Sequence, residues 1–428
     1  MRVLHLTPEF PPVIWGGLGT AVGGLATASS RAGMSVGVLL VGGPLVIGNK
    51  PYGAWQPVSL EQLEQITSEQ PIINNDGVIF FHVSPNDAAE AGIRLVHKWQ
   101  PDVIHLHTAW LWPVARAIQE QTGTPLIFTV HSLDRAEYEI GEFVTRWDTQ
   151  DTVIAAADRV VAISRSEKEL LAHYCPEAID RVRIVGNGID DCASAREAMR
   201  TKRWQTDSPL VLYTGRFVER KGIRELLEAI PQVLEKAPTT RFVLVGGYGG
   251  GAEIERGWMA DALLPYRSRV RFTGWLSPLE VAKWYCAADV LVVPSWYEPF
   301  GMVILEGMLH GLPIAAASVG GPAEILEHQR TGFLFSAKDA GALADALLKL
   351  VTDPMLRQRL GTAARSEVRR KWLWPHIVKK MQNVYREAFS TGLQPLSSYQ
   401  PSRSPGDVVH SSDGCFADSH SSARLTDE

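Results

Sequence analysis

The sequence has few cysteines and no strong excess of either charge. Its four cysteines, among 428 residues, stand at unrelated spacings and form no C-x-x-C pair. Disulfide frameworks and zinc sites need paired or regularly spaced cysteines, so neither is predicted. The formal net charge is −5. Because a dedicated nucleic-acid binder would show a basic patch or an excess of lysine and arginine, nucleic acid is not an expected partner.

The chain also lacks long hydrophobic runs. The opening segment, residues 1–7, reaches a proline-rich turn too soon for the apolar core of a signal peptide. Elsewhere glycine, proline or charge interrupts every apolar run well short of the ~20 residues that a membrane helix needs. We therefore expect a cytoplasmic protein without a transmembrane segment. Peripheral attachment to a membrane stays open, because an ordinary helix can carry one amphipathic face.

What the sequence does contain is an alternation of short β-branched runs with longer amphipathic stretches, the pattern of βαβ units and parallel sheets. In the first half, the expected strands are 3–7, 36–41, 78–83, 103–107, 126–130, 160–163 and 182–185, and the expected helices are 18–31, 88–99, 113–121 and 166–174. A second series of expected strands covers 210–215, 242–245, 270–273, 290–294, 313–317 and 332–335.

The alternation is interrupted once, after Asn187-Gly188-Ile189-Asp190, by a polar stretch. A chain of 428 residues is long enough for two ordinary domains, each with its own core. We predict an α/β protein with two doubly wound domains and a ligand in the cleft between them, at the carboxyl ends of the strands. The predicted divisions are a first domain 1–190, a linker 191–208, a second domain 209–374, a last helix 375–390 and a disordered, apolar-poor tail 391–428.

The most informative segment follows the expected strand 290–294 and reads Ser-Trp-Tyr-Glu-Pro-Phe-Gly-Met-Val-Ile-Leu-Glu-Gly, residues 295–307. Gly301 lets the backbone approach a ligand closely, and the helix expected from Met302 offers unpaired N–H groups to a phosphate. Glu298 lies in the loop and Glu306 lies in the second turn of the helix. Two carboxylates so placed can hold two hydroxyl-bearing parts of one ligand, as in a sugar joined to a nucleoside diphosphate. Taken alone, they could also be two glutamates facing water.

The second domain opens with a strand and the pattern G-R-x-x-x-x-K-G, which places Arg216 and Lys221 at the exit of that strand. When a nucleoside diphosphate departs, negative charge builds on its bridging oxygen and β-phosphate. Fixed cations at that place stabilise the transition state. The alternative is a pair of solvated cations at a helix start.

The first domain offers two candidates at strand ends. Gly16 and Gly17 stand between the opening strand and a helix, where they permit a tight turn and close approach of a main-chain amide to a diphosphate. His131 ends the strand 126–130, and a histidine there can hydrogen-bond a transferred sugar. The competing interpretations are an ordinary turn and a structural histidine.

The His105-Leu106-His107 sequence looks at first like a metal-binding pair. The side chains of a strand are divided between its two faces, and we expect these two rings to diverge. No third ligand is in view, and we interpret the pair as structural, with no metal site.

The glycine-rich run 246–252 nearly fits the dinucleotide fingerprint G-x-G-x-x-A. No acidic residue ends the next strand, however, so a mobile loop beside a nucleotide is favoured over an NAD site. No cofactor is expected.

The segment 295–307 closely resembles the signature of retaining glycosyltransferases of family four and of the neighbouring glycogen and starch synthases. In those families the first glutamate contacts the donor sugar and the second binds the ribose hydroxyls. The resemblance gives these roles to Glu298 and Glu306. It also assigns the turn amides of Phe300, Gly301 and Met302 to the sugar and the diphosphate.

Other motifs appear in the family's order over residues 1 to 390. By resemblance, Arg216 and Lys221 match the donor-phosphate pair, and His131 matches the active-site histidine in its T-x-H context. Gly16 and Gly17 match the glycine pair, and Trp275 and Leu276 match the segment whose backbone meets the nucleobase. The resemblance implies a GT-B architecture, two Rossmann-like domains facing across a cleft, with the helix 375–390 crossing back to the first domain.

The implied activity is metal-independent, retaining transfer of a hexose, glucose above all, from a nucleoside diphosphate sugar to a hydroxyl acceptor; no D-x-D motif is present. Ile14 and Thr20 stand where glycogen and starch synthases carry Lys and Asp. The His131-Ser132-Leu133 context resembles sucrose-phosphate synthases, although Glu137 replaces their Lys. We therefore expect a small or lipid-linked saccharide acceptor. Glucan elongation, a nucleotide-sugar 2-epimerase and an inactive nucleotide-binding module remain the alternatives.

Overall fold

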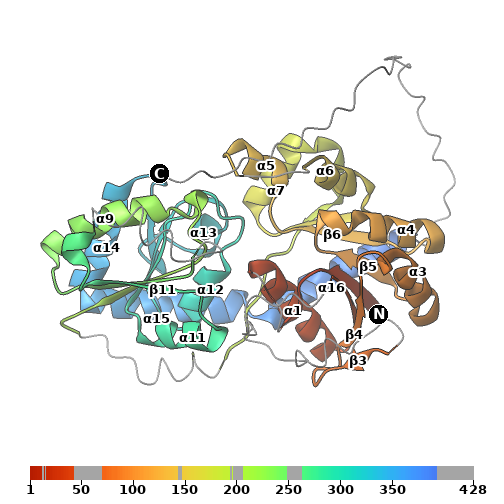
Figure 1. Cartoon of the computed structure of the whole chain (residues 1–428), viewed down its shortest axis with the longest axis horizontal. Coiled ribbons are helices and arrows are strands. Elements are labelled where there is room, and N and C mark those ends of the chain that lie inside the picture. The colour runs from red at the N-terminus through yellow and green to blue at the C-terminus, as the bar shows by residue number, and fades with distance from the viewer. Residues whose placement is uncertain are drawn as a thin grey trace, which may run out of the picture. The chain divides into compact units, whose positions relative to one another are not determined.

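The computed structural model describes residues 1–11, 14, 16–42, 70–142, 147–192, 195, 206–247 and 263–392. Two parallel sheets organise them (Figure 1). This confirms the α/β class expected from the sequence. None of the helices in this part of the chain combines the length and apolar character needed to cross a membrane.

The first sheet has eight strands in the order β3-β4-β2-β1-β5-β6-β7-β8, all parallel except the β3–β4 pair. Its strands are β1 (Arg2–Thr7), β2 (Ser35–Val41), β3 (Ile72–Ile73), β4 (Ile79–Val83), β5 (Val103–Leu106), β6 (Leu126–Val130), β7 (Arg159–Ala162) and β8 (Val182–Ile184). The accompanying helices are α1 (Gly17–Arg31), α3 (Ala88–Trp99), α4 (Trp112–Thr122), α5 (Asp134–Glu139), α6 (Trp147–Ala156) and α7 (Arg165–Tyr174), with short 3-10 turns η1 (Ala109–Leu111) and η2 (Pro176–Arg181).

Helices cover both faces of this sheet, because successive residues of a strand point into two different cores. Leu4 and Leu6 of β1 pack in the core that contains α3 and α4. Val3 of the same strand packs in the core formed with α1 and α16 (Trp374–Gly392). The strands are buried on both sides, so they appear in the sequence as continuous apolar runs.

The second sheet has six parallel strands in the order β11-β10-β9-β12-β13-β14. They are β9 (Leu210–Thr214), β10 (Arg241–Val245), β11 (Val270–Gly274), β12 (Val290–Val293), β13 (Ile314–Ala317) and β14 (Gly332–Phe335). The helices are α9 (Ile223–Lys236), α11 (Pro278–Ala287), α12 (Met302–Leu309), α13 (Gly320–Ile325), α14 (Ala340–Thr352) and α15 (Pro354–Lys371), with 3-10 turns η3 (Glu219–Lys221) and η4 (Leu264–Tyr266).

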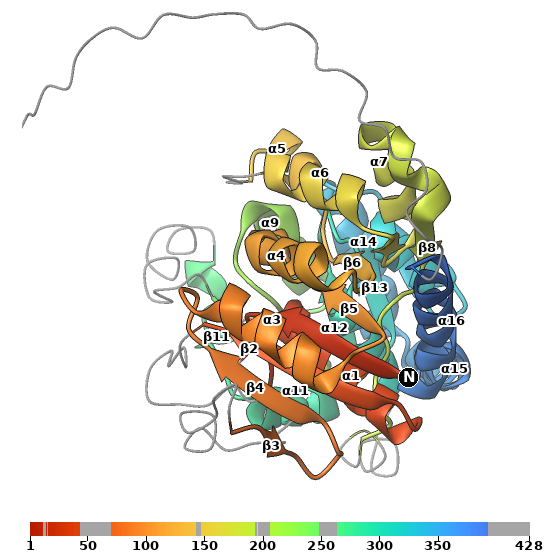
Figure 2. The ribbon, with the colours of Figure 1, turned by 90° about the vertical axis from the view of Figure 1, so that its right-hand side faces the viewer.

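The last helix, α16, packs on the first sheet. Trp374 and Tyr385 are buried there, and Figure 2 shows the helix in dark blue beside the edge strand β8. Arg183 of β8 and Glu387 of α16 form an ion pair at 2.8 Å. The ring of Trp374 lies so close to Gly24 of α1 that a Cβ on this glycine would overlap it.

Every strand expected from the sequence is present, with small shifts at the ends. The sequence did not predict β3, α5 or α6. Most of the predicted linker 191–208 and the tail from residue 393 lie outside the described residues. The domain boundaries therefore stay a prediction.

Each sheet has one point at which its strand order changes direction. β1 lies between β2 and β5, and β9 lies between β10 and β12. In open α/β sheets, ligands bind outside the carboxyl ends of the strands at this switch point. The segments after β1, β5, β9 and β12 are therefore the places to search for a site.

Candidate active site

A close ion pair joins the loops that follow β9 and β12. Nζ of Lys221 lies 2.5 Å from Oε2 of Glu298, and Oγ of Ser295 donates to the same carboxylate oxygen at 3.2 Å. Both charged side chains are largely buried. The structure thus brings together two predicted site residues that lie 77 positions apart in the sequence.

The surroundings of Lys221 weaken its hold on its proton. Burial lowers the pKa of Lys221, the carboxylate of Glu298 opposes this, and the charges of Arg220 and Arg216 add to the lowering. Arg220 is balanced by ion pairs with Glu137 and Glu142, whereas the Arg216 side chain is exposed. A ligand phosphate would place negative charge beside Arg216 and Lys221.

Arg216, two residues beyond β9, is exposed. Its backbone is fixed, because the hydroxyl of Tyr213 donates to its carbonyl oxygen at 2.8 Å. The guanidinium thus remains accessible to a ligand while the chain beneath it is held in place.

Glu306 belongs to a second hydrogen-bonded group at the same end of the sheet. The hydroxyl of Tyr285 donates to Oε2 of Glu306 at 2.6 Å, and Oγ1 of Thr214 lies 2.9 Å from that hydroxyl oxygen. Burial raises the pKa of the Glu306 carboxyl, and the hydrogen bond from Tyr285 opposes the shift. Tyr285 and Thr214 were not predicted from the sequence, because their spacing from Glu306 follows no local pattern.

The Pro-Phe-Gly turn leads from the loop that carries Glu298 into α12. Gly301 is the N-cap residue of α12 and has a φ of 96°, a conformation that favours glycine. The Phe300 side chain is 3% exposed and packs edge-on against Trp372, so only its backbone could meet a ligand. Among the described residues no side chain caps the N-terminus of α12, and its first turn holds no acidic residue.

Gly16 and Gly17 occupy the corresponding place in the first sheet. Gly16 precedes α1, whose N-terminus likewise has no side-chain cap within the described residues and no acidic residue in its first turn. A Cβ built on Gly16 or Gly17 would meet no atom within 4 Å of the described chain. The main chain is therefore open to a ligand at this point.

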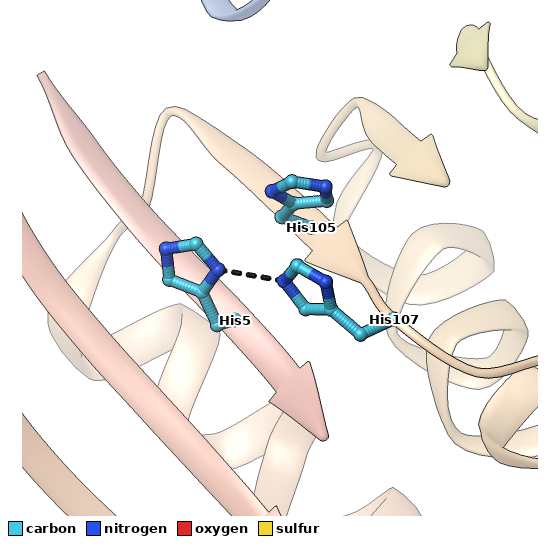
Figure 3. Close-up of side chains that lie close together, drawn as sticks. All are labelled: His5, His105 and His107. Carbon is cyan, nitrogen blue, oxygen red and sulfur yellow. Dashed lines mark hydrogen bonds between the residues drawn. The ribbon is translucent and has the colours of Figure 1, made fainter. Parts of the chain in front are cut away.

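His131 lies beyond β6 and is linked to two other histidines. Its Nε2 lies 3.2 Å from Nδ1 of His107. Figure 3 shows the next contact, in which Nε2 of His107 lies 2.9 Å from Nδ1 of His5. His5 pairs with His105 in the β1–β5 register, so these side chains share one face of the sheet.

The expectation that the rings of His105 and His107 diverge was wrong, because their centroids are 4.1 Å apart. Residues two positions apart along an extended chain share one face, as Leu4 and Leu6 of β1 do, so the spacing of His105 and His107 brings their rings together. His5 also provides the third histidine that was not apparent in the sequence.

Trp275 and Leu276 follow β11. Trp275 is 45% exposed, whereas Leu276 is partly buried against the second sheet's core. Most of the glycine-rich run 246–252 lies outside the described residues.

Tyr297 connects the loop after β12 with α7 and with the segment after β6. Its hydroxyl donates to Oε1 of Glu167 at 3.1 Å and accepts the N–H of Leu133 at 3.3 Å. Arg220 adds an ion pair with Glu137 at 3.2 Å. These contacts hold the segment after His131 against the loop that carries Glu298. The sequence did not predict them because they join residues 130 and 164 positions apart.

Buried Glu167 gives this contact a pH dependence. Burial raises its pKa to about 7, from a usual 4.5. Between these values the folded protein retains a proton that the unfolded chain has lost, so stability falls as pH rises through this window. The glutamine of Glu167→Gln stays neutral at every pH. The unfolding free energy of this variant should therefore rise relative to that of the wild type by up to about 3 kcal/mol as the pH increases from about 5 to about 8.

Denaturant unfolding at about pH 5 and about pH 8 measures this difference in unfolding free energy between the variant and the wild type. Glu169→Gln, an exposed change on the same helix, is the matched control and should give no pH-dependent gain. Parallel stability profiles for wild type and Glu167→Gln would contradict the assignment.

Two family models match the chain. Residues 15–191 match the one described as Glycosyltransferase Family 4, and residues 208–353 match the one described as Glycosyl transferases group 1. The first match lies in the part of the chain that forms the first sheet, and the second match lies in the part that forms the second sheet.

Similar proteins agree with this grouping. The chain is 26% identical to glycogen synthase of Mycobacterium tuberculosis over 417 residues, which cover 92% of this chain and 97% of that protein. It is 33% identical to the D-inositol 3-phosphate glycosyltransferase of Xylanimonas cellulosilytica over 309 residues, covering 67% and 72% of the two chains. The structure of a sucrose-phosphate synthase from Thermosynechococcus elongatus superposes with a TM-score of 0.71 at 26% identity, covering 91% of this chain and 99% of that one.

Proposed function

Because this chain belongs to glycosyltransferase family 4 and has the GT-B fold, we propose that it transfers a hexose, glucose above all, from a nucleoside diphosphate sugar to a hydroxyl acceptor with retention of anomeric configuration. The single observation that carries this proposal is the Lys221–Glu298 pair at 2.5 Å, with Arg216 beside it, at the switch point of the second sheet.

The chemistry follows from where charge develops. As the bond between sugar and diphosphate breaks, the leaving group gains negative charge, and Arg216 and Lys221 stabilise it without a metal ion. Glu298 exchanges part of its ion pair for hydroxyls of the donor sugar. The uncapped N-termini of α1 and α12 direct main-chain N–H groups to the phosphates.

Retention requires the acceptor to approach the donor's front face. In our proposal an oxocarbenium-like state forms there, and a leaving phosphate oxygen takes the proton of the acceptor hydroxyl. The new glycosidic bond then forms as the bond to the diphosphate breaks.

For the acceptor we propose a small or lipid-linked saccharide. Two of the similar proteins are named for small phosphorylated compounds, D-inositol 3-phosphate glycosyltransferase and sucrose-phosphate synthase. Glucan elongation is the second candidate, since the glycogen synthase match spans 92% of this chain. Ile14 and Thr20, which depart from the glucan-elongating pattern, favour the small acceptor.

A matrix of donors and acceptors tests the proposal. Purified protein is incubated with UDP-, ADP- or GDP-glucose and with glycogen, sugar phosphates, inositol phosphates or lipid-linked sugars. Release of nucleoside diphosphate should require a small or lipid-linked acceptor. Release of nucleoside diphosphate without any acceptor would favour a 2-epimerase. Nucleotide binding without release would favour an inactive module. Robust chain growth on glycogen would favour glucan elongation.

Glu306→Ala should weaken nucleotide binding. We assign the ribose hydroxyls to this carboxylate, and a hydrogen bond to a charged group contributes about 1.5–3 kcal/mol, so the Kd for nucleoside diphosphate should rise about tenfold or more. Titration calorimetry measures the Kd. Tyr285→Phe, which removes the hydroxyl that holds Glu306, should give a smaller loss. Unchanged affinity in Glu306→Ala would refute the ribose role.

A further inference from the structure

His5, His107 and His131 are linked in series by two hydrogen bonds and form a histidine chain. His5 contacts His107 through Nδ1, and His107 contacts His131 through its own Nδ1. His5 is fully buried and His107 is 3% exposed, whereas His131 is partly buried at the carboxyl end of β6. The chain therefore runs from the core of the first sheet to a residue that we assign to the donor sugar.

All three rings are neutral at neutral pH. Burial lowers the pKa of His5 to about 3 and that of His131 to about 4. It also lowers the pKa of His107 well below 6.5, and the neighbouring histidines His105, His5 and His131 lower it further. A neutral imidazole has one N–H and one bare nitrogen. Two bonds in series then allow only two arrangements, with every N–H directed toward His131 or every N–H directed away from it.

The inner end of the chain distinguishes these arrangements. Nε2 of His5 is buried and has no hydrogen-bond partner among the described residues. If the protons point away from His131, this nitrogen carries an unpaired N–H. If they point toward His131, it carries only a bare lone pair. Orphaned buried N–H groups are rare in proteins because they lose a full hydrogen bond with water, so the second arrangement is favoured.

We propose that His5 and His107 are positioning residues that hold His131 as the tautomer with its proton on Nδ1. His107 donates to Nε2 of His131, and Nδ1–H of His131 is left to donate to a hydroxyl oxygen of the transferred sugar. Nδ1 of His131 has no partner among the described residues, which leaves it available for this contact. The inference rests on the proposed function, in which His131 faces the donor.

A metal ion held by His5, His105 and His107 is the competing explanation, since their ligand atoms lie within 4.8 Å of one another. Both nitrogens of His105 are already engaged, one 2.9 Å from the Tyr385 hydroxyl and the other 2.7 Å from that of Thr129. The 2.9 Å between His5 and His107 is a hydrogen-bond distance. Two imidazoles on one tetrahedral zinc ion, with bonds of about 2.05 Å, would stand roughly 3.3 Å apart.

Nitrogen NMR tests the tautomer without relying on activity. Full-length protein labelled with ¹⁵N-histidine is recorded at neutral pH, and the His131 signals are assigned by their loss in His131→Gln. We expect the pattern of a neutral ring protonated at Nδ1. A ring protonated at Nε2 or on both nitrogens would overturn the proposal, as would one equivalent of bound zinc in the purified protein. The proposed function would survive such a result if glycosyl transfer is observed.

Two variants of His107 separate positioning from packing. The amide nitrogen of asparagine replaces Nδ1 of histidine, whereas that of glutamine replaces Nε2. His107→Asn should therefore keep the donor to His131, its tautomer and most of the turnover. His107→Gln should give mixed tautomers and lower kcat about tenfold or more, with KM little changed. Equal turnover in the two variants, at similar melting temperatures, would contradict the proposal. If neither variant folds, the wild-type spectrum decides.

Discussion

Replacing Arg216 by alanine should lower turnover about a hundredfold or more, the usual effect of removing one preorganised group that acts on developing charge. The Arg216 side chain is exposed, so the unfolding free energy should change by no more than about 0.5 kcal/mol. Lys221→Ala should lose turnover to a similar degree. It should also cost about 1–3 kcal/mol of stability, because Glu298 stays largely buried without its cation.

Initial rates at saturating donor, together with denaturant unfolding, measure both effects. The matched control is Arg224→Ala, which removes the same charge from an exposed position three residues beyond Lys221, on α9. Its turnover should remain at the wild-type level. Wild-type turnover in a folded Arg216→Ala or Lys221→Ala protein would show that the phosphate assignment is wrong.

The second large effect is expected at Gly321, at the start of α13. Its N–H donates to the carbonyl oxygen of Glu298 at 3.0 Å, and a Cβ at this position would overlap the carbonyl group of Phe300. Gly321→Ala must therefore displace the Pro-Phe-Gly turn. We expect a loss of about 1–3 kcal/mol or more in unfolding free energy, together with weaker nucleotide binding.

Gly341→Ala is the matched control, because Gly341 is likewise the second residue of its helix, α14. The nearest atom to an added Cβ there is Oδ1 of Asp339 at 3.4 Å, an ordinary contact. Stability should stay the same or rise slightly, since alanine favours helix more than glycine does. Equal stability of Gly321→Ala and Gly341→Ala would contradict the close packing of α13 on the turn.

The sequence predicts the elements of this fold well because the strands are buried on both faces. Runs such as residues 210–213 and 290–293 are continuously apolar, and glycine or proline lies close to their ends. The edge strand β3 was missed, because two residues are too short to carry a pattern. The helix α5 was missed because its six residues are mostly polar.

For the candidate site, the sequence predicted the residues at strand ends but not the partners that hold them. Glu298 and Lys221 could be assigned because each follows a strand, and parallel strands bring their ends to one edge. The hydroxyl that holds Glu306 comes from Tyr285 on another helix, and the contact of Tyr297 with Glu167 joins residues 130 positions apart. The histidine chain was misjudged because His105 and His107 were expected on opposite faces, whereas residues two positions apart on a strand share one face.

The most direct test of the central claim is the anomeric configuration of the product. The protein is incubated with the α-linked nucleoside diphosphate glucose and the acceptor that releases most nucleotide, and the proton coupling constant at the new anomeric centre is measured by NMR. Our account predicts an α-glycoside whose amount equals the nucleoside diphosphate released. A β-glycoside, or nucleotide release without a glycosylated acceptor, would contradict it.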